Sequence, residues 1–280
     1  MESNLYKHIL QFYNYLGIDI LFSSISNTTT FEHSNNIQKV SSKLNNVTKA
    51  GVVVNNPKKL NNVFNNSLSN DSSNNLNNNH ITDSNVFYNN NPQVESNPQL
   101  KQLLEEINNI DCLIKHTARN TVIFDGDINS KVMIIGEAPG QEEDIQGKPF
   151  VGQSGILLNN MLQAVGLSRQ DVIISNIVFW RPPLNRTPST DEVSLCLPYI
   201  KRLIKIINPE ILLLLGAVSN HALLNTMASM STLRGSVNHV LDIKTISTYH
   251  PAYLLRGSSQ KKQVFKDLLL LKHILSSYTI

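Results

Sequence analysis

The sequence has few cysteines and no long apolar run, and each absence excludes a class of protein. Cys112 and Cys196 are the two cysteines among 280 residues. A disulfide-stapled fold is therefore not supported, and a reducing cytoplasm is the simplest location. No run of about 18 apolar residues occurs, so we expect no membrane span. The N-terminus also lacks the basic start of a signal peptide.

The sequence also has little excess of either charge, since the formal net charge is only +3. This value does not exclude nucleic acid as a partner, because a local basic groove matters more than the sum. The first 97 residues carry six basic and six acidic side chains, so the basic surplus lies in residues 98–280.

Composition divides the chain into three parts. Residues 1–26 include apolar side chains at helical spacing, which predicts a short N-terminal helical segment. Residues 27–97 are rich in asparagine, with 17 asparagines in residues 51–100, and we expect a disordered low-complexity linker. A partner-binding tail is the alternative for this tract. Residues 98–280 have a globular pattern and are predicted to form a single folded domain.

Strand and helix patterns alternate through this C-terminal part. Strands are predicted at 131–135, 172–177 and 211–215 and within 233–240 and 241–249. Helices are predicted at 100–110, 154–165, 190–207, 217–225 and 260–276. This alternation indicates an α/β fold with a mostly parallel sheet between two helical layers.

Two short motifs directly follow predicted strands. Residues 136–140 read Gly-Glu-Ala-Pro-Gly, and residues 250–256 read His-Pro-Ala-Tyr-Leu-Leu-Arg. We interpret both motifs as loops. In an open α/β sheet, ligands bind outside the carboxyl ends of the strands. The two motifs therefore predict a common site.

The first motif is a poor phosphate loop. It has neither the P-loop pattern nor the full dinucleotide fingerprint, and residues 141–144 add an acidic run. Phe150 follows between two turn signals. An acidic loop beside a phenyl ring suits a flat, uncharged base stacked on that ring. A plug in the core is the alternative role for Phe150.

A side-chain amide and two arginines follow the next strand. Asn176 offers one donor and one acceptor, which fits the edge of a base or lactam. Arg181 and Arg186 lie in a segment with three prolines that we expect to contact phosphates. A solvated surface loop is the alternative for this segment.

The second motif combines a histidine with leucines and an arginine. His250 precedes a proline at a strand end, where it has either a catalytic role or a structural hydrogen bond. We expect Leu254 and Leu255 to be exposed and to enter a base stack as a wedge. Arg256 would then meet a phosphate.

Taken together, these motifs resemble the uracil-DNA glycosylase superfamily, in particular its family-4 (type-4) branch. The resemblance runs from about residue 110 to the C-terminus, with four motifs in order at matching separations. It implies a three-layer αβα sandwich with a central, mostly parallel four-stranded sheet. It also implies hydrolysis of the N-glycosidic bond of deoxyuridine in base-excision repair. We expect a monomer that binds uracil-containing DNA at the nucleoid.

The resemblance also assigns residues to the uracil pocket. The backbone near Glu137 and Ala138 lines it, Phe150 stacks on the base, and Asn176 bonds the base edge. Glu143 falls at the position that closes the pocket near C5, where the methyl group of thymine would clash.

Two residues carry the implied chemistry. His250 faces O2 of the base and, with backbone N–H groups near Ala138, would stabilise the leaving uracil anion. Ala138 cannot activate water, so Glu137 is the candidate to polarise water or to offset positive charge on the sugar. No cofactor is required for this reaction.

The family-4 pattern includes four cysteines that ligate a 4Fe–4S cluster. Cys112 and Cys196 match two of these positions, and Asn109 and Trp180 stand at the other two. We therefore expect no cluster or a degenerate one, with Trp180 filling the space. Inert core residues are the alternative role for the two cysteines.

Two other functions fit the same motifs. One is a superfamily member that binds uracil-containing DNA without turnover. The other is a polymerase-associated DNA-binding module, whose affinity for DNA would not depend on uracil.

Overall fold

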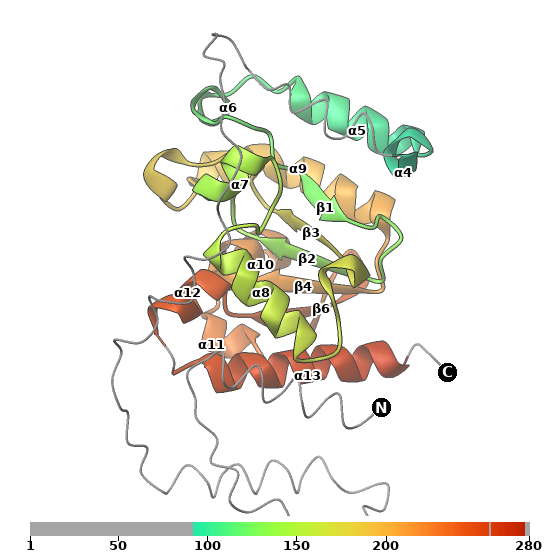
Figure 1. The fold of residues 1–280 in the computed structure, drawn as a ribbon, viewed down its shortest axis with the longest axis vertical. Coiled ribbons are helices and arrows are strands. Elements are labelled where there is room, and N and C mark those ends of the chain that lie inside the picture. The colour runs from blue at the N-terminus through green and yellow to red at the C-terminus, as the bar shows by residue number, and fades with distance from the viewer. Residues whose placement is uncertain (1–91, 258, 278–280) are drawn as a thin grey trace, which may run out of the picture. The chain divides into compact units, whose positions relative to one another are not determined.

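The computed structural model describes residues 92–257 and 259–277 (Figure 1). The predicted helical segment 1–26 and most of the predicted linker 27–97 lie outside the described residues. Helix α4 (Pro92–Glu95) falls within the range predicted for the linker. Val94 is buried in the core, and Asn97 Oδ1 accepts the Leu100 N–H at 3.1 Å to cap the next helix.

The described residues form one six-stranded sheet. Its order is β1-β3-β2-β4-β6-β5. The strands are β1 (Phe124–Gly126), β2 (Val132–Gly136), β3 (Val172–Asn176), β4 (Ile211–Leu215), β5 (Val237–Val240) and β6 (Ile243–Thr248). The central strands β3, β2, β4 and β6 are parallel, as predicted. Antiparallel β1 and β5 extend the sheet beyond the four strands that the resemblance implied.

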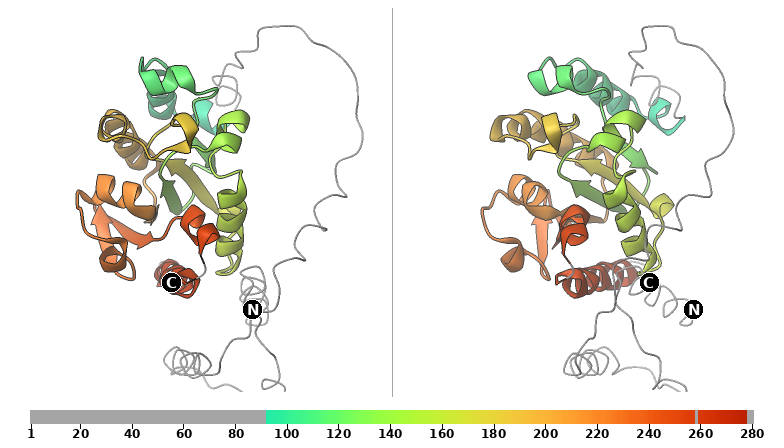
Figure 2. Two further views of the ribbon diagram at one scale, coloured as in Figure 1. Left: turned by 90° about the vertical axis from the view of Figure 1, so that its left-hand side faces the viewer. Right: turned by 60° about the vertical axis from the view of Figure 1, so that its left-hand side comes forward.

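Helices cover both faces of the sheet, which confirms the three-layer prediction (Figure 2). The helices after α4 are α5 (Pro98–Asn108), α6 (Leu113–Thr117), α7 (Gln141–Gln146), α8 (Gln153–Gln163), α9 (Thr190–Ile207), α10 (Gly216–Leu224), α11 (Met230–Leu233), α12 (Pro251–Arg256) and α13 (Lys261–Ser277). Two 3-10 turns, η2 (Arg169–Asp171) and η3 (Pro183–Asn185), precede β3 and α9.

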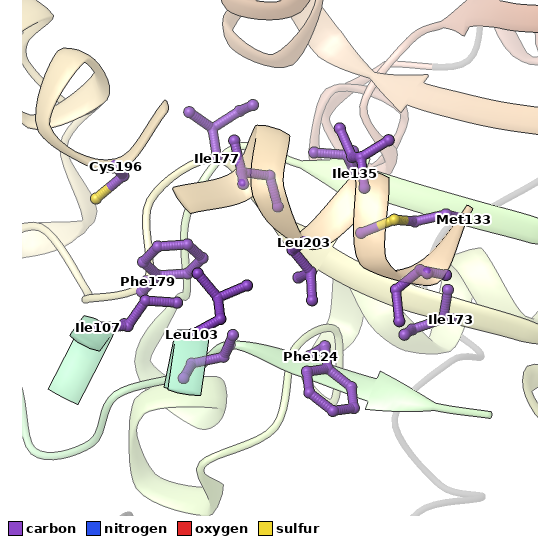
Figure 3. Close-up of a cluster of buried hydrophobic side chains, with 14 of the residues drawn as sticks. Leu103, Ile107, Phe124, Met133, Ile135, Ile173, Ile177, Phe179, Cys196 and Leu203 are labelled. Carbon is purple, nitrogen blue, oxygen red and sulfur yellow. The ribbon is translucent and has the colours of Figure 1, made fainter. Parts of the chain in front are cut away.

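Strand β2 shows why the central strands are apolar throughout. Met133 and Ile135 pack on one side with α5 and α9, as Figure 3 shows around Leu103 and Leu203. Val132 packs on the other side with α8 and α13. Strands that are covered on both faces have no solvent side on which to place polar residues.

The second motif is a helix, so our interpretation of residues 250–256 as a loop is wrong. Pro251 occupies the first helical position, where a missing N–H costs nothing and the fixed φ favours the helix. His250 is the N-cap, and its Nδ1 accepts the Ala252 N–H at 3.1 Å.

A buried ion pair holds the end of β6. Asp267 on α13 is fully buried and accepts hydrogen bonds from Arg234 Nη2 at 2.6 Å and Thr248 Oγ1 at 2.8 Å. Burial raises the pKa of Asp267, although both partners oppose the rise. Thr248 is the last residue of β6, so the pair fixes the backbone two residues before His250.

We expect Arg234→Ala to destabilise the fold by about 3 kcal/mol, because it leaves the Asp267 carboxylate buried and unpaired. Urea unfolding followed by circular dichroism measures this loss. The control is Arg202→Ala, which breaks a more exposed pair with Glu106 and should lower the stability much less. Equal losses in the two variants would contradict the special role of the buried pair.

Candidate active site

The site lies where the parallel strands end. Gly136 at the end of β2 is in register with Asn176 at the end of β3. Leu215 at the end of β4 is in register with Thr248 at the end of β6. Carboxyl ends of parallel strands share one edge of the sheet, so both motifs belong to that edge. Figure 1 shows α7 and α12, which follow these motifs, on the same side of the sheet.

The Asn176 amide is buried without a partner. Its side chain belongs to a residue that is only 1% exposed, and neither Oδ1 nor Nδ2 has a hydrogen-bond partner among the described residues. An unpaired buried amide destabilises a fold. A buried polar group of this kind is therefore poised for a ligand.

Gly136 provides the space beside this amide. A Cβ there would lie 2.4 Å from Asn176 Oδ1 and 2.6 Å from Phe150 Cε2 and Cζ. The amide and the phenyl ring thus both lie over the Cα of Gly136. Any larger residue would displace one of them, so glycine is required at the end of β2.

Phe150 and His250 form the other side of the same space. Their ring centroids are 5.5 Å apart, with the planes tilted by 32°. Phe150 is buried, as expected either for a core plug or for a stacking wall. A Cβ at Gly216 would lie 2.9 Å from His250 Cβ, so a second glycine lets the histidine approach the end of β4.

His250 is a neutral donor at physiological pH. Burial, with a smaller contribution from the Arg256 cation, lowers its pKa to about 4. Because Nδ1 accepts the Ala252 N–H, the neutral ring carries its proton on Nε2. That atom can donate to a ligand oxygen.

The two motifs meet electrostatically through Arg256. Burial raises the pKa of Glu137, and the Arg256 cation opposes that rise. The same cation depresses the pKa of His250. The first motif is also held to the segment after β3, since Glu137 O accepts the Val178 N–H at 3.1 Å. Ala138 is half-buried beside them.

The Glu143 carboxylate braces two loops. One oxygen accepts the N–H groups of Val151 at 2.9 Å and Gly152 at 2.8 Å. The other accepts the Gly140 N–H at 3.1 Å. Both oxygens are therefore engaged with backbone. The position near C5 of the base, which the resemblance implied for Glu143, stays a prediction.

The segment with the proposed wedge differs from expectation. Leu254 is 1% exposed, so our expectation of an exposed leucine is wrong there: the α12 helix turns this side chain into the core shared with α8 and α13. Leu255 is 48% exposed and Arg256 is exposed. Tyr253 is also exposed and stacks on Tyr249 at 5.4 Å.

The arginines after β3 stabilise their own loop. Arg181 Nε donates to Asn185 Oδ1 at 2.7 Å. Arg186 forms a two-bond pair with Glu192 at 2.6 and 2.8 Å. Between them, Leu184 is 96% exposed and has a φ of +57°. We expected no role for this leucine, although its place beside two prolines was a signal.

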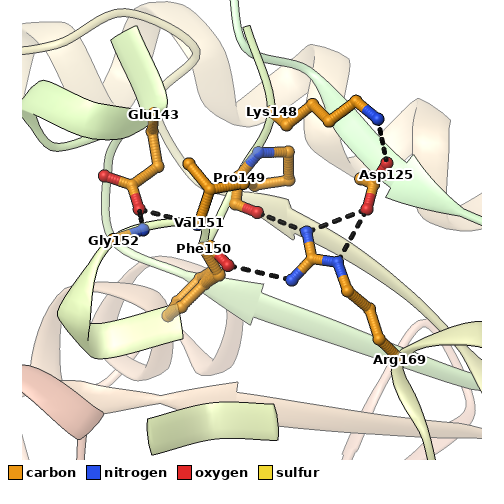
Figure 4. Close-up of polar contacts among 8 residues, drawn as sticks. All are labelled: Asp125, Glu143, Lys148, Pro149, Phe150, Val151, Gly152 and Arg169. Atoms are coloured by element: carbon orange, nitrogen blue, oxygen red, sulfur yellow. Dashed lines mark hydrogen bonds and ion pairs between the residues drawn. The ribbon is translucent and has the colours of Figure 1, made fainter. Parts of the chain in front are cut away.

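The sequence analysis also missed the residues that hold Phe150. Arg169 donates to the carbonyl oxygens of Pro149 and Phe150 and pairs with Asp125 (Figure 4). Gly155 admits the Phe150 carbonyl, because a Cβ there would lie 1.9 Å from its oxygen. No local pattern signals these contacts, since Arg169 and Asp125 are 44 residues apart.

The residues present do not fit a four-thiolate cluster. Trp180 is fully buried, and its Nε1 donates to Thr121 Oγ1 at 3.0 Å. Burial raises the pKa of the Cys196 thiol to about 12, and nearby Cys112 adds to the rise. Asn109 is the C-cap of α5. Within the part of the chain that the structure describes, no three His, Cys, Asp or Glu residues form a metal-binding group.

Among the described residues, no helix has the length and apolarity that crossing a membrane requires.

Comparison with known proteins agrees with this geometry. The family model of the uracil DNA glycosylase superfamily matches residues 123–271. The type-4 uracil-DNA glycosylase of Pyrobaculum aerophilum is 39% identical over 180 residues, which is 61% of this chain and 92% of that protein. The type-4 enzyme of Thermotoga maritima is 38% identical over 56% of this chain and 84% of its own length. A DNA polymerase of Bacillus phage SP01 is 28% identical over 55% of this chain and 17% of its own length. The chain belongs to the uracil DNA glycosylase superfamily, in its type-4 branch.

Proposed function

We propose that this protein hydrolyses the N-glycosidic bond of deoxyuridine in DNA and releases free uracil for base-excision repair. The observation that carries the proposal is the buried amide of Asn176, which has no hydrogen-bond partner among the described residues, beside Phe150 and a neutral His250. The type-4 uracil-DNA glycosylases among its relatives support the same activity. We expect it to act as a monomer in the cytoplasm, on DNA of the nucleoid.

Base recognition begins with extrusion of the uracil nucleotide from the duplex, which costs a few kcal/mol. The base then stacks on Phe150. The Asn176 amide offers an acceptor for N3–H and a donor for O4 of uracil. Cytosine presents the reverse order on this edge, so an amide held in one orientation leaves its polar groups unpaired.

Bond cleavage transfers the bonding electron pair to uracil, which leaves as an anion, while water adds to C1′ of the sugar and releases a proton to the solvent. The His250 Nε2–H donates to O2, where negative charge develops. A preorganised neutral donor of this kind stabilises the anion without moving a proton. We infer that Glu137 in the first motif polarises the water or offsets the positive charge on the sugar.

The DNA backbone meets the segments on either side of this edge. We infer that Arg256 and Leu255 on α12, and Arg181 and Arg186 after β3, contact the DNA. Exposed leucines beside cations suit a surface that props open a base stack while it binds phosphates. Leu184, at the tip of η3, joins this surface.

The alternative functions make different predictions for the same DNA. A binder without turnover retains uracil DNA, and a covalent adduct would appear on a denaturing gel. The match to a phage polymerase keeps a polymerase-associated module as a second candidate. That module would bind uracil-containing and thymine-containing DNA equally.

We expect the purified protein to release free uracil from a uracil-containing oligonucleotide, measured by chromatography of the base. Asn176→Ala should lower kcat/KM by about 100-fold, because one buried polar contact to the reacting base is lost. Asn129→Ala, in an exposed turn, is the matched control and should leave the rate unchanged. If micromolar wild-type protein releases no uracil and Asn176→Ala behaves identically, the enzyme proposal fails.

An unperturbed histidine titrates near pH 6.5. We expect the pH profile of the uracil-release rate to show no inflection there. His250 stays neutral down to its folded pKa of about 4. Its unfolded form binds a proton first, so its contribution to stability is present above about pH 6.5 and declines as the pH falls toward 4. Histidine NMR titration measures the pKa directly.

The Arg256→Ala variant tests how far the Arg256 cation lowers the pKa of His250. It removes a repulsive cation, so the pKa of His250 should rise, although burial still keeps it below the ordinary value. A His250 pKa near 6.5 in the wild-type protein would contradict the neutral-donor role.

We expect the purified protein to contain no stoichiometric iron and no visible absorbance of an iron–sulfur cluster, because Trp180 occupies core space near Cys196. Iron chelation should leave its thermal unfolding curve unchanged. Trp180→Ala should destabilise the protein by about 3 kcal/mol through the cavity that it creates. Four iron atoms per chain after anaerobic purification would overturn this expectation.

A further inference from the structure

Phe150 holds its ring in place with an unfavourable backbone. Its φ is +53°, in the left-handed region that residues with a Cβ avoid. Glycine would relieve the strain but would remove the ring. Such a conformation persists only where several contacts from the surrounding structure hold it in place.

A guanidinium fixes the carbonyl side of this residue. Arg169, in η2, donates through Nη1 to the Phe150 carbonyl at 2.9 Å and through Nη2 to the Pro149 carbonyl at 2.6 Å. Its Nε donates to Asp125 Oδ2 on β1 at 2.8 Å. The planar fork thus joins two consecutive peptides to the edge strand of the sheet, as Figure 4 shows.

A carboxylate fixes the other side. Glu143 on α7 accepts the next two backbone N–H groups, those of Val151 and Gly152. Figure 4 shows Glu143 and Arg169 on opposite sides of the Phe150 backbone. The Arg169 cation therefore binds the two carbonyl groups that end at Phe150. The Glu143 anion binds the two N–H groups that follow it.

We propose that Arg169, anchored by Asp125, is a positioning residue that keeps the Phe150 ring at the height where uracil stacks. This inference rests on the proposed uracil pocket. The ring must stay over the Cα of Gly136 and beside Asn176, in the space where a Cβ at Gly136 would meet both side chains. Without the guanidinium, Phe150 can relax from φ +53° to a negative φ, which moves the ring away from the base.

The test compares full-length wild-type protein with Arg169→Ala, Arg169→Lys and Arg202→Ala. Arg202 also forms an Arg–carboxylate pair, with Glu106, but it joins α9 to α5 and contacts no pocket residue. Three quantities are measured: kcat/KM for uracil release, inhibition by free uracil, and affinity for uracil-free DNA. Free uracil reports the pocket alone, and uracil-free DNA reports the outer surface alone.

We expect Arg169→Ala to lower kcat/KM by about 100-fold, as small misplacements of a bound group do. Inhibition by free uracil should weaken by about 10-fold, while affinity for uracil-free DNA stays within about twofold. Arg169→Lys should fall between wild type and alanine, because an ammonium cannot span both carbonyls and the carboxylate. Arg202→Ala should match the wild type in all three measurements.

NMR provides a readout that a general loss of stability would not change. The Phe150 ring lies 5.5 Å from the His250 ring, so its ring current shifts the imidazole signals. Those signals should move in Arg169→Ala and stay in place in Arg202→Ala.

The outcomes separate this inference from the proposed function. A wild-type protein that releases no uracil refutes the function. An active wild type, with a folded Arg169→Ala variant whose free-uracil inhibition and His250 signals are unchanged, overturns the positioning role. If Arg169→Ala does not fold, Arg169→Lys and Asp125→Asn decide on the same readouts, and wild-type values in both overturn the proposal. A parallel loss of uracil-free DNA affinity also overturns it.

Discussion

The close approach of two side chains over one glycine governs this site. Asn176 and Phe150 both occupy space that a Cβ at Gly136 would fill, and this is possible because β2 and β3 are parallel neighbours that end in register. The amide consequently faces a space with no protein partner among the described residues. The fold tolerates that cost because the central strands are buried on both faces. Their packing supplies the rigidity that keeps an unpaired group from relaxing.

The same burial determines the electrostatics of the reaction. His250 would be a partly charged residue in water, but its packing against Phe150 and Gly216 favours the neutral ring. The helix cap then selects the tautomer, because the Ala252 N–H occupies Nδ1. In the proposed reaction, a neutral donor held by the backbone would stabilise the developing charge with little reorganisation.

Sequence patterns predicted the layers well and the local geometry less well. The apolar runs at β2, β3 and β4 could be recognised because strands covered on both faces carry no polar alternation. Strand β1 was missed, since three residues are too short to show a period. Leu254 was misplaced because Pro251 indicates a turn as readily as the first turn of a helix. The location of Asn176 at the end of a strand could be predicted from the apolar run before it. The contact of Arg169 with Phe150 could not, because no local sequence pattern links two residues so far apart in the chain.

The backbone strain at Phe150 explains why the contacts made by Arg169 and Glu143 matter. A pocket wall that adopted a relaxed backbone would be easier to fold, but its ring would not lie over Gly136. The chain instead combines a left-handed residue with opposite charges on its two sides, and Gly155 leaves room for the carbonyl. Each of these contacts joins the Phe150 loop to a different element: β1 through Asp125, α7 through Glu143 and α8 through Gly155. The ring position therefore depends on several elements at this edge of the domain, and β1 is linked to Phe150 through Asp125 and Arg169.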